Sequence, residues 1–372
     1  MSVIRQLPDD VRGKIAAGEV IERPASVVKE LVENSLDAGA TDIRIAIRGG
    51  GCELIRVLDN GGGIDPEELP LAFSPHATSK LRVEDDLLNV RTLGFRGEAL
   101  ASIAAVAELS IVSSTGPGET GRAIVRHGDE ILRDEPYGGP GGTEVTVSRL
   151  FANFPVRLEF LKSERTELFR VMDITQHLAL GHPHVRFTLS SDDRVSFQTT
   201  GGGSLRDALV GVYDARLIDD TIEIPPDEFM GIHGFIGQPG KDRPNRRHIA
   251  FFVNRRWVTN RTLLGALTEA YRGMMPSGRH PIAIIHLTVP PDSVDVNIHP
   301  TKTEIRFRED GLIFGRVSKA IKRTLIERGD YVAVETGPEA VVDSFFVPSR
   351  MPTQPRHDGF PPDPVAGPPG AN

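Results

Sequence analysis

The feature that most constrains the fold is the segment from Pro24 to Gly39, PASVVKELVENSLDAG, which has the pattern of one amphipathic helix. Proline suits the first turn of a helix and glycine suits its end. Plotted at about 100° per residue, Glu30, Asn34 and Asp37 fall on one arc. The opposite arc is mostly apolar and consists of Val27, Val28, Leu31, Val32, Ser35, Leu36 and Ala38. The apolar arc predicts that the helix packs against a core.

The polar arc of this helix has two interpretations. A carboxylate and an amide one turn apart suit a site in which one group activates a water and the other binds a metal-bound phosphate. The same residues suit an ordinary solvated helix face, and a single helix does not distinguish the two. The segments that follow decide between them.

A predicted hairpin comes next, and it ends in a glycine-rich sequence. Period-two alternation predicts a strand over 42–48, three glycines predict the turn, and 53–58 is the returning strand. The returning strand runs into Asp59-Asn-Gly-Gly-Gly. This is either a plain turn or a backbone built for close approach to a ligand, in which a buried carboxylate accepts from the exocyclic amine of adenine.

A second glycine motif, Gly94-Phe-Arg-Gly97, precedes a helix predicted from about Glu98. Backbone amides at the start of a helix, with glycine before it, form a phosphate site. The sequence holds no Walker pattern, so the common P-loop is excluded. A G-x-G-x-x-G at 116–121 lies between strand-like runs at 109–113 and 122–126, which indicates a hairpin loop and not a dinucleotide site.

Composition limits the class of protein. The chain has 372 residues, 39% apolar and 25% charged, which is typical of a globular protein long enough for two domains. No run approaches the ~20 apolar residues of a membrane span, and the start has no signal-peptide layout, so we expect a cytoplasmic protein without a membrane partner. The one cysteine, Cys52, excludes an internal disulfide and a cysteine metal cluster. The net charge of −8 disfavours nucleic-acid binding by the whole surface but not by a local basic groove.

The rest of the chain alternates strands and helices. We predict helices over 166–180, 204–212, 261–272 and 312–328, and strands over 143–148, 185–190, 195–199, around 229–237, 248–258 and 281–289, with a strand–turn–strand unit at 294–307. Three glycines at 201–203 are the best internal boundary. From 337 the composition becomes Pro-rich and polar, which predicts a disordered linker or tail over 337–372.

Four blocks in this order resemble the GHKL ATPases, which share the Bergerat nucleotide fold. They are Glu30-x-x-x-Asn34, Asp59-x-Gly61-x-Gly63, Gly94-Phe-Arg-Gly97 and Gly142-Thr143. Within that superfamily, residues 17–40, 94–103 and 294–300 are similar to the MutL group of DNA mismatch repair proteins, and the resemblance covers roughly 3–330.

The resemblance implies an α/β fold in two domains. The first, 1–200, is an ATPase domain with a mixed sheet covered by helices on one face. The second, 204–330, is a smaller, transducer-like α/β domain of the ribosomal-protein type with DNA-binding potential. Both boundaries are expectations from the resemblance and from the glycines at 201–203.

The resemblance also implies roles for single residues. Glu30 is the general base, and Asn34 binds Mg²⁺. Asp59 receives the adenine amine, and Lys302 reaches the γ-phosphate from the second domain, although its spacing alone also fits an exposed hairpin lysine. The remaining nucleotide-binding residues implied are Asp37, Gly61, Gly63, Thr78, Ser79, Lys80, Gly94, Phe95, Arg96, Gly97, Glu98 and Thr143.

The implied function is an Mg²⁺-dependent ATPase that acts as a conformational clamp in DNA mismatch repair. It would couple mismatch recognition by MutS to a downstream nuclease or helicase, with an ATP-dependent homodimer of the N-terminal region. DNA would bind through Arg243, Arg246, Arg247, Arg255, Arg256 and Arg261, although each arginine singly also fits a solvated loop.

Two departures and several rival functions remain. Residues 150–161 differ from the usual family block at Phe154, Val156 and Leu158, near the domain junction. Nothing resembles the family's C-terminal dimerisation domain or endonuclease motif, so neither activity is predicted. The alternatives are a scaffold that binds ATP without splitting it, which the presence of Glu30 disfavours, and another GHKL machine. A topoisomerase subunit needs a strand-passage domain with an active tyrosine, and a sensor kinase needs a helix with a phosphoacceptor histidine, and this sequence shows neither. A chaperone would lack the block at 294–307, which this sequence has.

Overall fold

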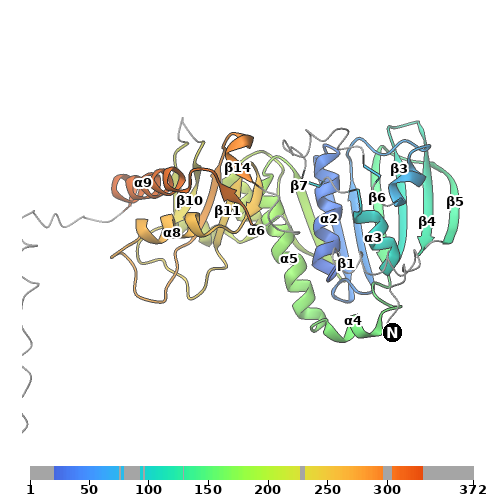
Figure 1. Cartoon of the computed structure of the whole chain (residues 1–372), viewed down its shortest axis with the longest axis horizontal. Coiled ribbons are helices and arrows are strands. Elements are labelled where there is room, and N and C mark those ends of the chain that lie inside the picture. Colours follow the sequence, from blue (N-terminus) through green and yellow to red (C-terminus); the bar gives the residue numbers. More distant parts are fainter. Residues whose placement is uncertain are drawn as a thin grey trace, which may run out of the picture. The chain divides into compact units, whose positions relative to one another are not determined.

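The computed structural model describes residues 21–74, 77–78, 93–94, 97–128, 130–226, 231–295 and 304–329, all of them within one compact unit. These residues form two large β-sheets with helices packed against them, in agreement with the predicted α/β class (Figure 1). Within the described ranges, no helix combines the length and the apolar character that crossing a membrane requires.

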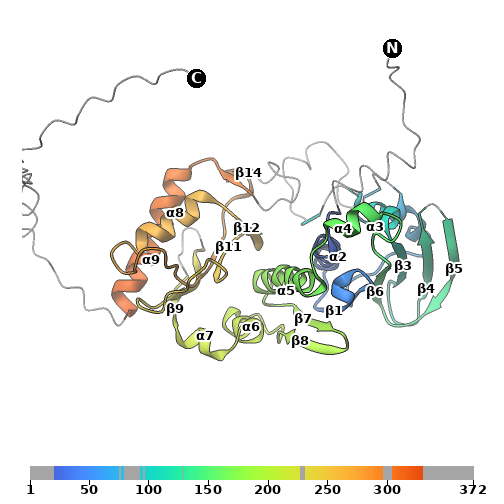
Figure 2. The ribbon, with the colours of Figure 1, turned by 90° about the horizontal axis from the view of Figure 1, so that it is seen from below.

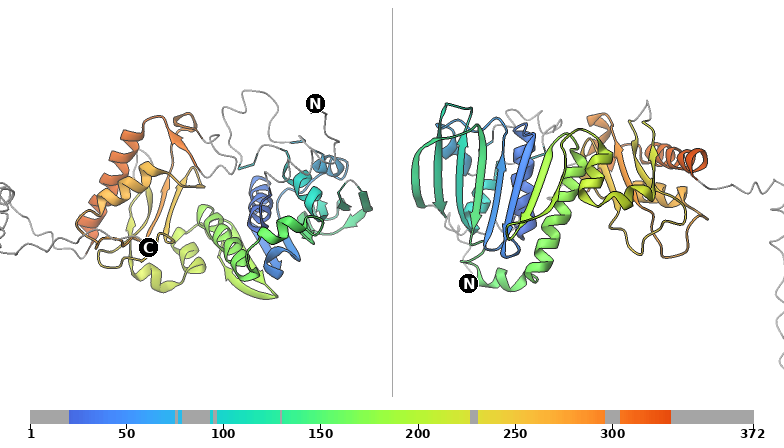
Figure 3. Two further views of the ribbon diagram at one scale, coloured as in Figure 1. Left: turned by 60° about the horizontal axis from the view of Figure 1, so that its bottom comes forward. Right: turned by 180° about the vertical axis from the view of Figure 1, so that it is seen from behind.

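The first sheet is mixed and has eight strands in the order β5-β4-β3-β6-β2-β1-β7-β8. Only the β1–β7 pairing is parallel. Helices α2 (Pro24–Asp37), α3 (Ala99–Val106) and α5 (Glu164–Gly181) cover one face, as predicted. In the view from behind, none of the described helices covers the opposite face (Figure 3). The strands are β1 (Asp42–Arg48), β2 (Leu54–Asp59), β3 (Glu108–Ser114), β4 (Thr120–His127), β5 (Glu130–Gly138), β6 (Gly142–Ser148), β7 (Arg186–Ser191) and β8 (Arg194–Gln198).

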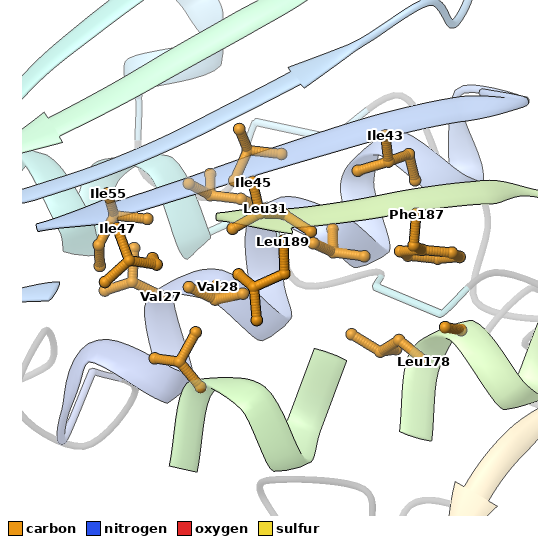
Figure 4. Close-up of a cluster of buried hydrophobic side chains, with 14 of the residues drawn as sticks. Val27, Val28, Leu31, Ile43, Ile45, Ile47, Ile55, Leu178, Phe187 and Leu189 are labelled. Atoms are coloured by element: carbon orange, nitrogen blue, oxygen red, sulfur yellow. The ribbon is translucent and has the colours of Figure 1, made fainter. Parts of the chain in front are cut away.

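Helix α2 packs its apolar arc on this sheet, as its sequence predicts. Val27, Val28 and Leu31 point toward β1, whose alternate residues, Ile43 among them, face the helix because side chains on a strand repeat every two residues (Figure 4). Leu178 of α5 closes the same cluster from the other side. Pro24 occupies the first turn, and Gly39 follows the helix at a φ of 75°, where the absence of a Cβ removes the steric penalty.

The second sheet has five strands in the order β12-β11-β13-β10-β9 and is covered on both faces. Its central strand β13 (Ala283–Leu287) is buried at every position. Ile284 joins the cluster shared with α5, whereas Ile285 joins the cluster under α8 and α9. The other elements are β9 (Thr221–Ile224), β10 (His233–Gly237), β11 (Ile249–Val253), β12 (Arg256–Val258), α6 (Leu205–Val212), α7 (Ala215–Asp219), α8 (Arg261–Ala270) and α9 (Asp310–Arg328).

Helix α5 contacts elements of both sheets. It packs against α2 and β7 on one side, and against α6 and β12 on the other (Figure 2). One apolar cluster therefore continues from α2 past α5 to Phe252 and Ile284. Because of this continuity, the division into two domains at 201–203 stays a prediction. The predicted tail at 337–372 lies outside the described residues.

One predicted element is wrong. The sequence predicts a single strand over 248–258, but the structure has a hairpin in which Asn254 and Arg255 turn the chain between β11 and β12. Their φ values are 50° and 68°, the left-handed conformation that a two-residue hairpin turn needs at both positions. Asparagine tolerates this conformation, but arginine gives no turn signal, so the turn is not apparent from the sequence. Strands β5 and β9 and helices α4 (Pro155–Phe160) and α7 also lack a predicted counterpart.

The remaining two strands form a minimal ladder. β14 (Val294–Asp295) pairs with β15 (Arg306–Phe307) in the antiparallel sense. This matches the predicted strand–turn–strand unit at both ends, although 296–303 lies outside the described residues.

Candidate functional site

The end of β2 places Asp59 beside helix α2. Asp59 is buried, and its Oδ2 accepts a 2.6 Å hydrogen bond from the Ser35 hydroxyl. Its Oδ1 accepts from the backbone N–H of Gly61 at 2.9 Å. The carboxylate is thus fixed by two donors, one from the helix and one from the turn that follows the strand. Carboxylate oxygens accept more than one hydrogen bond each, so Asp59 can still accept from a ligand amine.

Glycines allow the backbone to pack tightly around this carboxylate. Gly63 has a φ of 70°, and a Cβ there would lie 2.1 Å from the carbonyl oxygen of Ser114. Gly142 has a φ of 121°, and a Cβ there would lie 2.1 Å from the carbonyl oxygen of Asp59. Such distances exclude any side chain without a backbone shift, which explains why the glycines of both predicted motifs occur at these positions.

Thr143 lies beside Asp59 on the neighbouring strand. The two residues are partners in the β2–β6 register, and both are buried. The Thr143 hydroxyl lies 2.9 Å from that of Ser113, and Ser113 Oγ also accepts from the backbone N–H of Ile64 at 2.8 Å. The structure therefore brings the predicted residues Asp59, Gly63 and Thr143 together, with Ser113 as an additional member.

The polar arc of α2 carries Glu30 and Asn34 one turn apart, and both are half-buried. The Glu30 carboxylate lies 3.4 Å from the ammonium group of Lys29. Lys29 also pairs with Glu33 at 2.9 Å. Glu33 is buried, and burial raises the pKa of its carboxyl while the nearby Lys29 opposes that shift. The ends of three charged side chains thus meet on one turn of the helix.

Asp37, the last residue of α2, has a partner that the sequence does not predict. Its two carboxylate oxygens accept from the backbone N–H groups of Leu93 at 2.9 Å and Gly94 at 3.1 Å. The structure shows Asp37 anchoring the start of the second glycine motif to the helix, and its predicted role in nucleotide binding stays a prediction. That contact fixes the motif beside the polar arc of α2.

The end of the same motif packs against Thr78. Gly97 has a φ of 63°, and a Cβ there would lie 2.5 Å from the carbonyl oxygen of Ala77 and 3.0 Å from Thr78. Glu98 follows as the N-cap residue of α3, and its carbonyl accepts from the Ser102 N–H at 2.8 Å. The remaining predicted nucleotide-site residues lie outside the described ranges, namely Ser79, Lys80, Phe95, Arg96 and Lys302.

The arginines predicted to bind DNA occupy three kinds of environment. Arg246, Arg255 and Arg261 are exposed, and Arg247 is exposed with its guanidinium 4.9 Å from the centre of the Phe169 ring. Arg243 is engaged with Asp220 at 2.8 Å.

Arg256 differs from the others because it points inward. It lines a small cavity of about 20 Å³ with Lys29, Glu33 and Leu93. One of its amino groups donates to the Leu93 carbonyl at 3.3 Å. The predicted DNA contact of Arg256 stays a prediction.

Reasoning from the sequence missed three polar residues of this region. Ser35 was placed on the apolar arc, where a hydroxyl needs a buried partner, and that need was the available signal. Ser113 sits in a strand without any motif. Glu33 gave no signal, because its neighbours Lys29 and Glu30 made it resemble a solvated residue. In the described part of the chain, no cluster of three or more His, Cys, Asp or Glu side chains could hold a metal ion by itself.

Two family models match the chain. The model described as "Histidine kinase-, DNA gyrase B-, and HSP90-like ATPase" matches residues 21–128. The model described as "DNA mismatch repair protein, C-terminal domain" matches residues 209–326. The first match contains Glu30, Asn34, Asp59 and the second glycine motif, and the second contains the hairpin that carries Arg256.

Curated relatives are similar along most of this chain. The DNA mismatch repair protein MutL of Streptococcus sanguinis is 43% identical over 329 residues, which is 88% of this chain and 51% of that protein. MutL of Staphylococcus carnosus is 43% identical over 336 residues, 89% of this chain and 52% of that protein. The chain therefore spans about half the length of the curated relatives it matches.

Solved structures share the fold. The N-terminal domain of a DNA repair protein aligns with a TM-score of 0.73 at 27% identity, over 84% of this chain and 97% of that one. The Aquifex aeolicus MutL ATPase domain complexed with ADP aligns with a TM-score of 0.54 at 32% identity, over 73% of this chain and 94% of that one.

Proposed function

The chain belongs to the MutL family of DNA mismatch repair proteins, and from this premise we propose that it binds and hydrolyses ATP with Mg²⁺ and uses the cycle as a conformational clamp in mismatch repair. The observation that carries the proposal is the joint position of Asp59, the glycines around it and the polar arc of α2. A structure of a relative in the same fold holds ADP, which supports a nucleotide as the ligand.

Asp59 is proposed to select adenine. Its carboxylate is buried and held by Ser35 and Gly61 at 2.6 Å and 2.9 Å, so it presents a fixed acceptor. Adenine offers an exocyclic amine, whereas guanine offers a carbonyl oxygen at the equivalent ring position, which a carboxylate repels. Gly63 allows the backbone beside Asp59 to approach Ser114 closely, which leaves room for a flat base.

Glu30 is proposed to act on the attacking water. In hydrolysis, a water oxygen forms a bond to the γ-phosphorus, the bond to the β-bridging oxygen breaks, and ADP leaves. Glu30 accepts a proton from that water, and the products are ADP and inorganic phosphate. Glu30 is half-buried on the polar arc of α2, and its carboxylate lies 3.4 Å from the ammonium group of Lys29.

Asn34 is proposed to bind Mg²⁺ together with the nucleotide phosphates. The residues fit this ion, because Mg²⁺ takes oxygen ligands and is usually held by one or two protein groups plus substrate phosphates and not by an all-protein cage. The absence of a three-residue metal cluster among the described side chains agrees with that mode. When bound, Mg²⁺ neutralises phosphate charge. Lys302 is proposed to reach the γ-phosphate and lies outside the described residues.

The wider cycle is also a proposal. ATP would favour a homodimer of the N-terminal region and hydrolysis would release it, and the clamp would couple MutS to a downstream nuclease or helicase. DNA would bind through the exposed arginines, Arg246, Arg247, Arg255 and Arg261. Because the chain carries a net charge of −8, this binding must come from a local basic patch.

Nucleotide selectivity tests the proposed base site. Wild type is expected to bind and hydrolyse ATP and to discriminate against GTP, measured by equilibrium binding and by phosphate release with Mg²⁺. Asp59→Asn replaces one acceptor oxygen of the carboxylate by the NH₂ donor of an amide, and this change should weaken ATP binding relative to GTP binding. Equal affinity of the wild type for ATP and GTP would contradict the role of Asp59.

A salt titration tests the DNA contacts. Charge reversal of Arg246 and Arg247 should reduce the dependence of DNA affinity on salt, with a slope change of about one per lost phosphate contact. Arg323→Glu is the control, because Arg323 is also exposed but lies on α9 next to Glu327. An unchanged slope in the double reversal would exclude these arginines as phosphate contacts.

A further inference from the structure

Arg256 is the one residue of the second sheet whose side chain, in the described part of the chain, donates a hydrogen bond to the start of the second glycine motif. It begins β12, directly after the turn at Asn254 and Arg255. Its guanidinium donates to the carbonyl oxygen of Leu93 at 3.3 Å.

Helix α2 holds the same backbone from the other side. Asp37 accepts from the N–H of Leu93 and from the N–H of Gly94, at 2.9 Å and 3.1 Å. Two different charged residues therefore bind the backbone of Leu93. Asp37 of α2 accepts from its N–H, and Arg256 of β12 donates to its carbonyl oxygen. A backbone segment fixed at both polar groups has little freedom to shift.

Arg256 also adds positive charge to the polar arc of α2. It interacts electrostatically with the carboxylates of Glu33, Asp37 and Glu30. Lys29 contacts two of these, Glu33 at 2.9 Å and Glu30 at 3.4 Å. Two cations thus lie near three carboxylates, one of which, Glu33, is buried, so removing the arginine leaves one cation for three carboxylates next to the proposed base.

Glu33 shows why this cluster depends on Arg256. Its Oε2 is buried and has no hydrogen-bond partner in the structure described. Its carboxyl is compensated by Lys29 through contact and by Arg256 through charge. A buried carboxylate that loses one of two compensating cations moves toward the neutral form or draws Lys29 away from Glu30.

The hairpin that carries Arg256 is itself firmly seated on α5. Trp257 stacks on His177, with ring centres 4.1 Å apart and planes inclined by 23°. Gly181 at the end of α5 admits the carbonyl of Arg255, since a Cβ there would lie 2.6 Å from that oxygen. These two contacts hold the hairpin on α5 and so fix the position from which the Arg256 guanidinium reaches Leu93.

We propose that Arg256 is a positioning residue for nucleotide hydrolysis, which ties the second sheet to the Leu93–Gly94 backbone and to the charge balance around Glu30. The inference rests on the proposed function, because it assumes that Glu30 and the Gly94 region serve ATP hydrolysis. It makes turnover depend on the seating of the second sheet without any contact between Arg256 and the nucleotide.

Three variants test the inference. Arg256→Met removes the charge and the hydrogen bond, Arg256→Lys keeps the charge but not the planar fork, and Arg323→Met removes an exposed, ion-paired arginine of α9 as a matched control. Each is measured for kcat, for ATP affinity, for the urea midpoint and for amide exchange of a peptide containing Leu93 and Gly94 without nucleotide.

The proposal gives a distinct pattern of results. Arg256→Met should lower kcat about tenfold while ATP affinity changes much less, and should speed amide exchange at Leu93 and Gly94. Arg256→Lys should fall between wild type and Arg256→Met in both readouts. Arg323→Met should match wild type in all of them. A general loss of stability would lower the urea midpoint but would not lower kcat much more than it lowers ATP affinity.

Contrary outcomes are separable. Wild-type kcat and wild-type exchange in Arg256→Met overturn the positioning role while leaving the proposed ATPase intact. A wild-type chain that neither binds nor hydrolyses ATP overturns the proposed function and the inference with it. If Arg256→Met does not fold, Arg256→Lys decides, because wild-type turnover and exchange in that variant overturn the inference.

Discussion

The hydrogen bond between Ser35 and Asp59 offers the sharpest test of how the base site is built. Ser35→Ala removes one oxygen atom and leaves the helix otherwise intact, since alanine is the best helix former. The lost contact is the 2.6 Å bond from the hydroxyl to Asp59 Oδ2. Asp59 then keeps only the Gly61 N–H at 2.9 Å among its protein donors in the described structure.

The size of the effect follows from burial and charge. Asp59 is 7% exposed and Ser35 is 3% exposed, so water cannot replace the lost donor without a rearrangement. A hydrogen bond to a charged group contributes about 1.5–3 kcal/mol, so Ser35→Ala should lower the free energy of unfolding by about that amount. Because Asp59 loses orientation, affinity for an adenine nucleotide should fall about tenfold or more.

Urea denaturation and equilibrium binding measure the two effects. Ser190→Ala is the matched control, because the Ser190 hydroxyl donates to a neutral carbonyl, that of Ile45, at 3.2 Å. A bond to a neutral group contributes about 1 kcal/mol, so the control should be milder and should leave nucleotide affinity unchanged. If Ser35→Ala matched Ser190→Ala in both assays, the view that Ser35 holds Asp59 in place would be wrong.

Two further predictions concern backbone conformation and pH. Gly142→Ala should lower the free energy of unfolding by about 1–3 kcal/mol, because its Cβ would lie 2.1 Å from the Asp59 carbonyl oxygen. Gly118 is the control, since it also has a positive φ but has open space around it. Gly118→Ala should lower the free energy of unfolding by less, as measured by the same urea titration. Burial lowers the pKa of His286 to about 3, helped by the nearby His233, and burial lowers the pKa of His182 to about 4. An unfolded histidine titrates near ~6.5, so both groups contribute stability that is present above that pH and is lost as the pH falls toward the folded values. We expect the free energy of unfolding to fall by about 2 kcal/mol per histidine between about pH 7 and about pH 5. His286→Phe should make this fall smaller. A urea midpoint that does not change with pH in this range would contradict the prediction.

The periodic parts of the fold were predictable from the sequence. The alternation over 42–48 gives β1 with the predicted bounds, and the apolar arc of the first helix gives the buried face of α2. Both signals are local, because they depend on which side of one element faces the core. The α/β class and the family were likewise predictable, since the glycine motifs and the α2 segment hold their order along the chain.

The features that could not be predicted from the sequence depend on tertiary contacts. Strand β5 is mostly exposed and pairs at the sheet edge, so it has no apolar alternation to reveal it. Arg256 resembles its neighbour Arg255 in the sequence, yet Arg255 is an exposed residue of the hairpin turn, whereas Arg256 begins β12 and donates to the Leu93 carbonyl. Asp37 accepts hydrogen bonds from backbone amides more than fifty residues away along the chain, and no local pattern indicates such a contact.

The central claim is that the polar arc of α2 performs chemistry, and one comparison tests it most directly. ATP hydrolysis and ATP binding are measured side by side for the purified chain and for Glu30→Ala with Mg²⁺. The account predicts slow turnover by the wild type, and a variant that binds ATP but does not split it. Equal turnover by the two proteins would show that Glu30 is not the base, and binding without turnover in both would point to an ATP-gated scaffold.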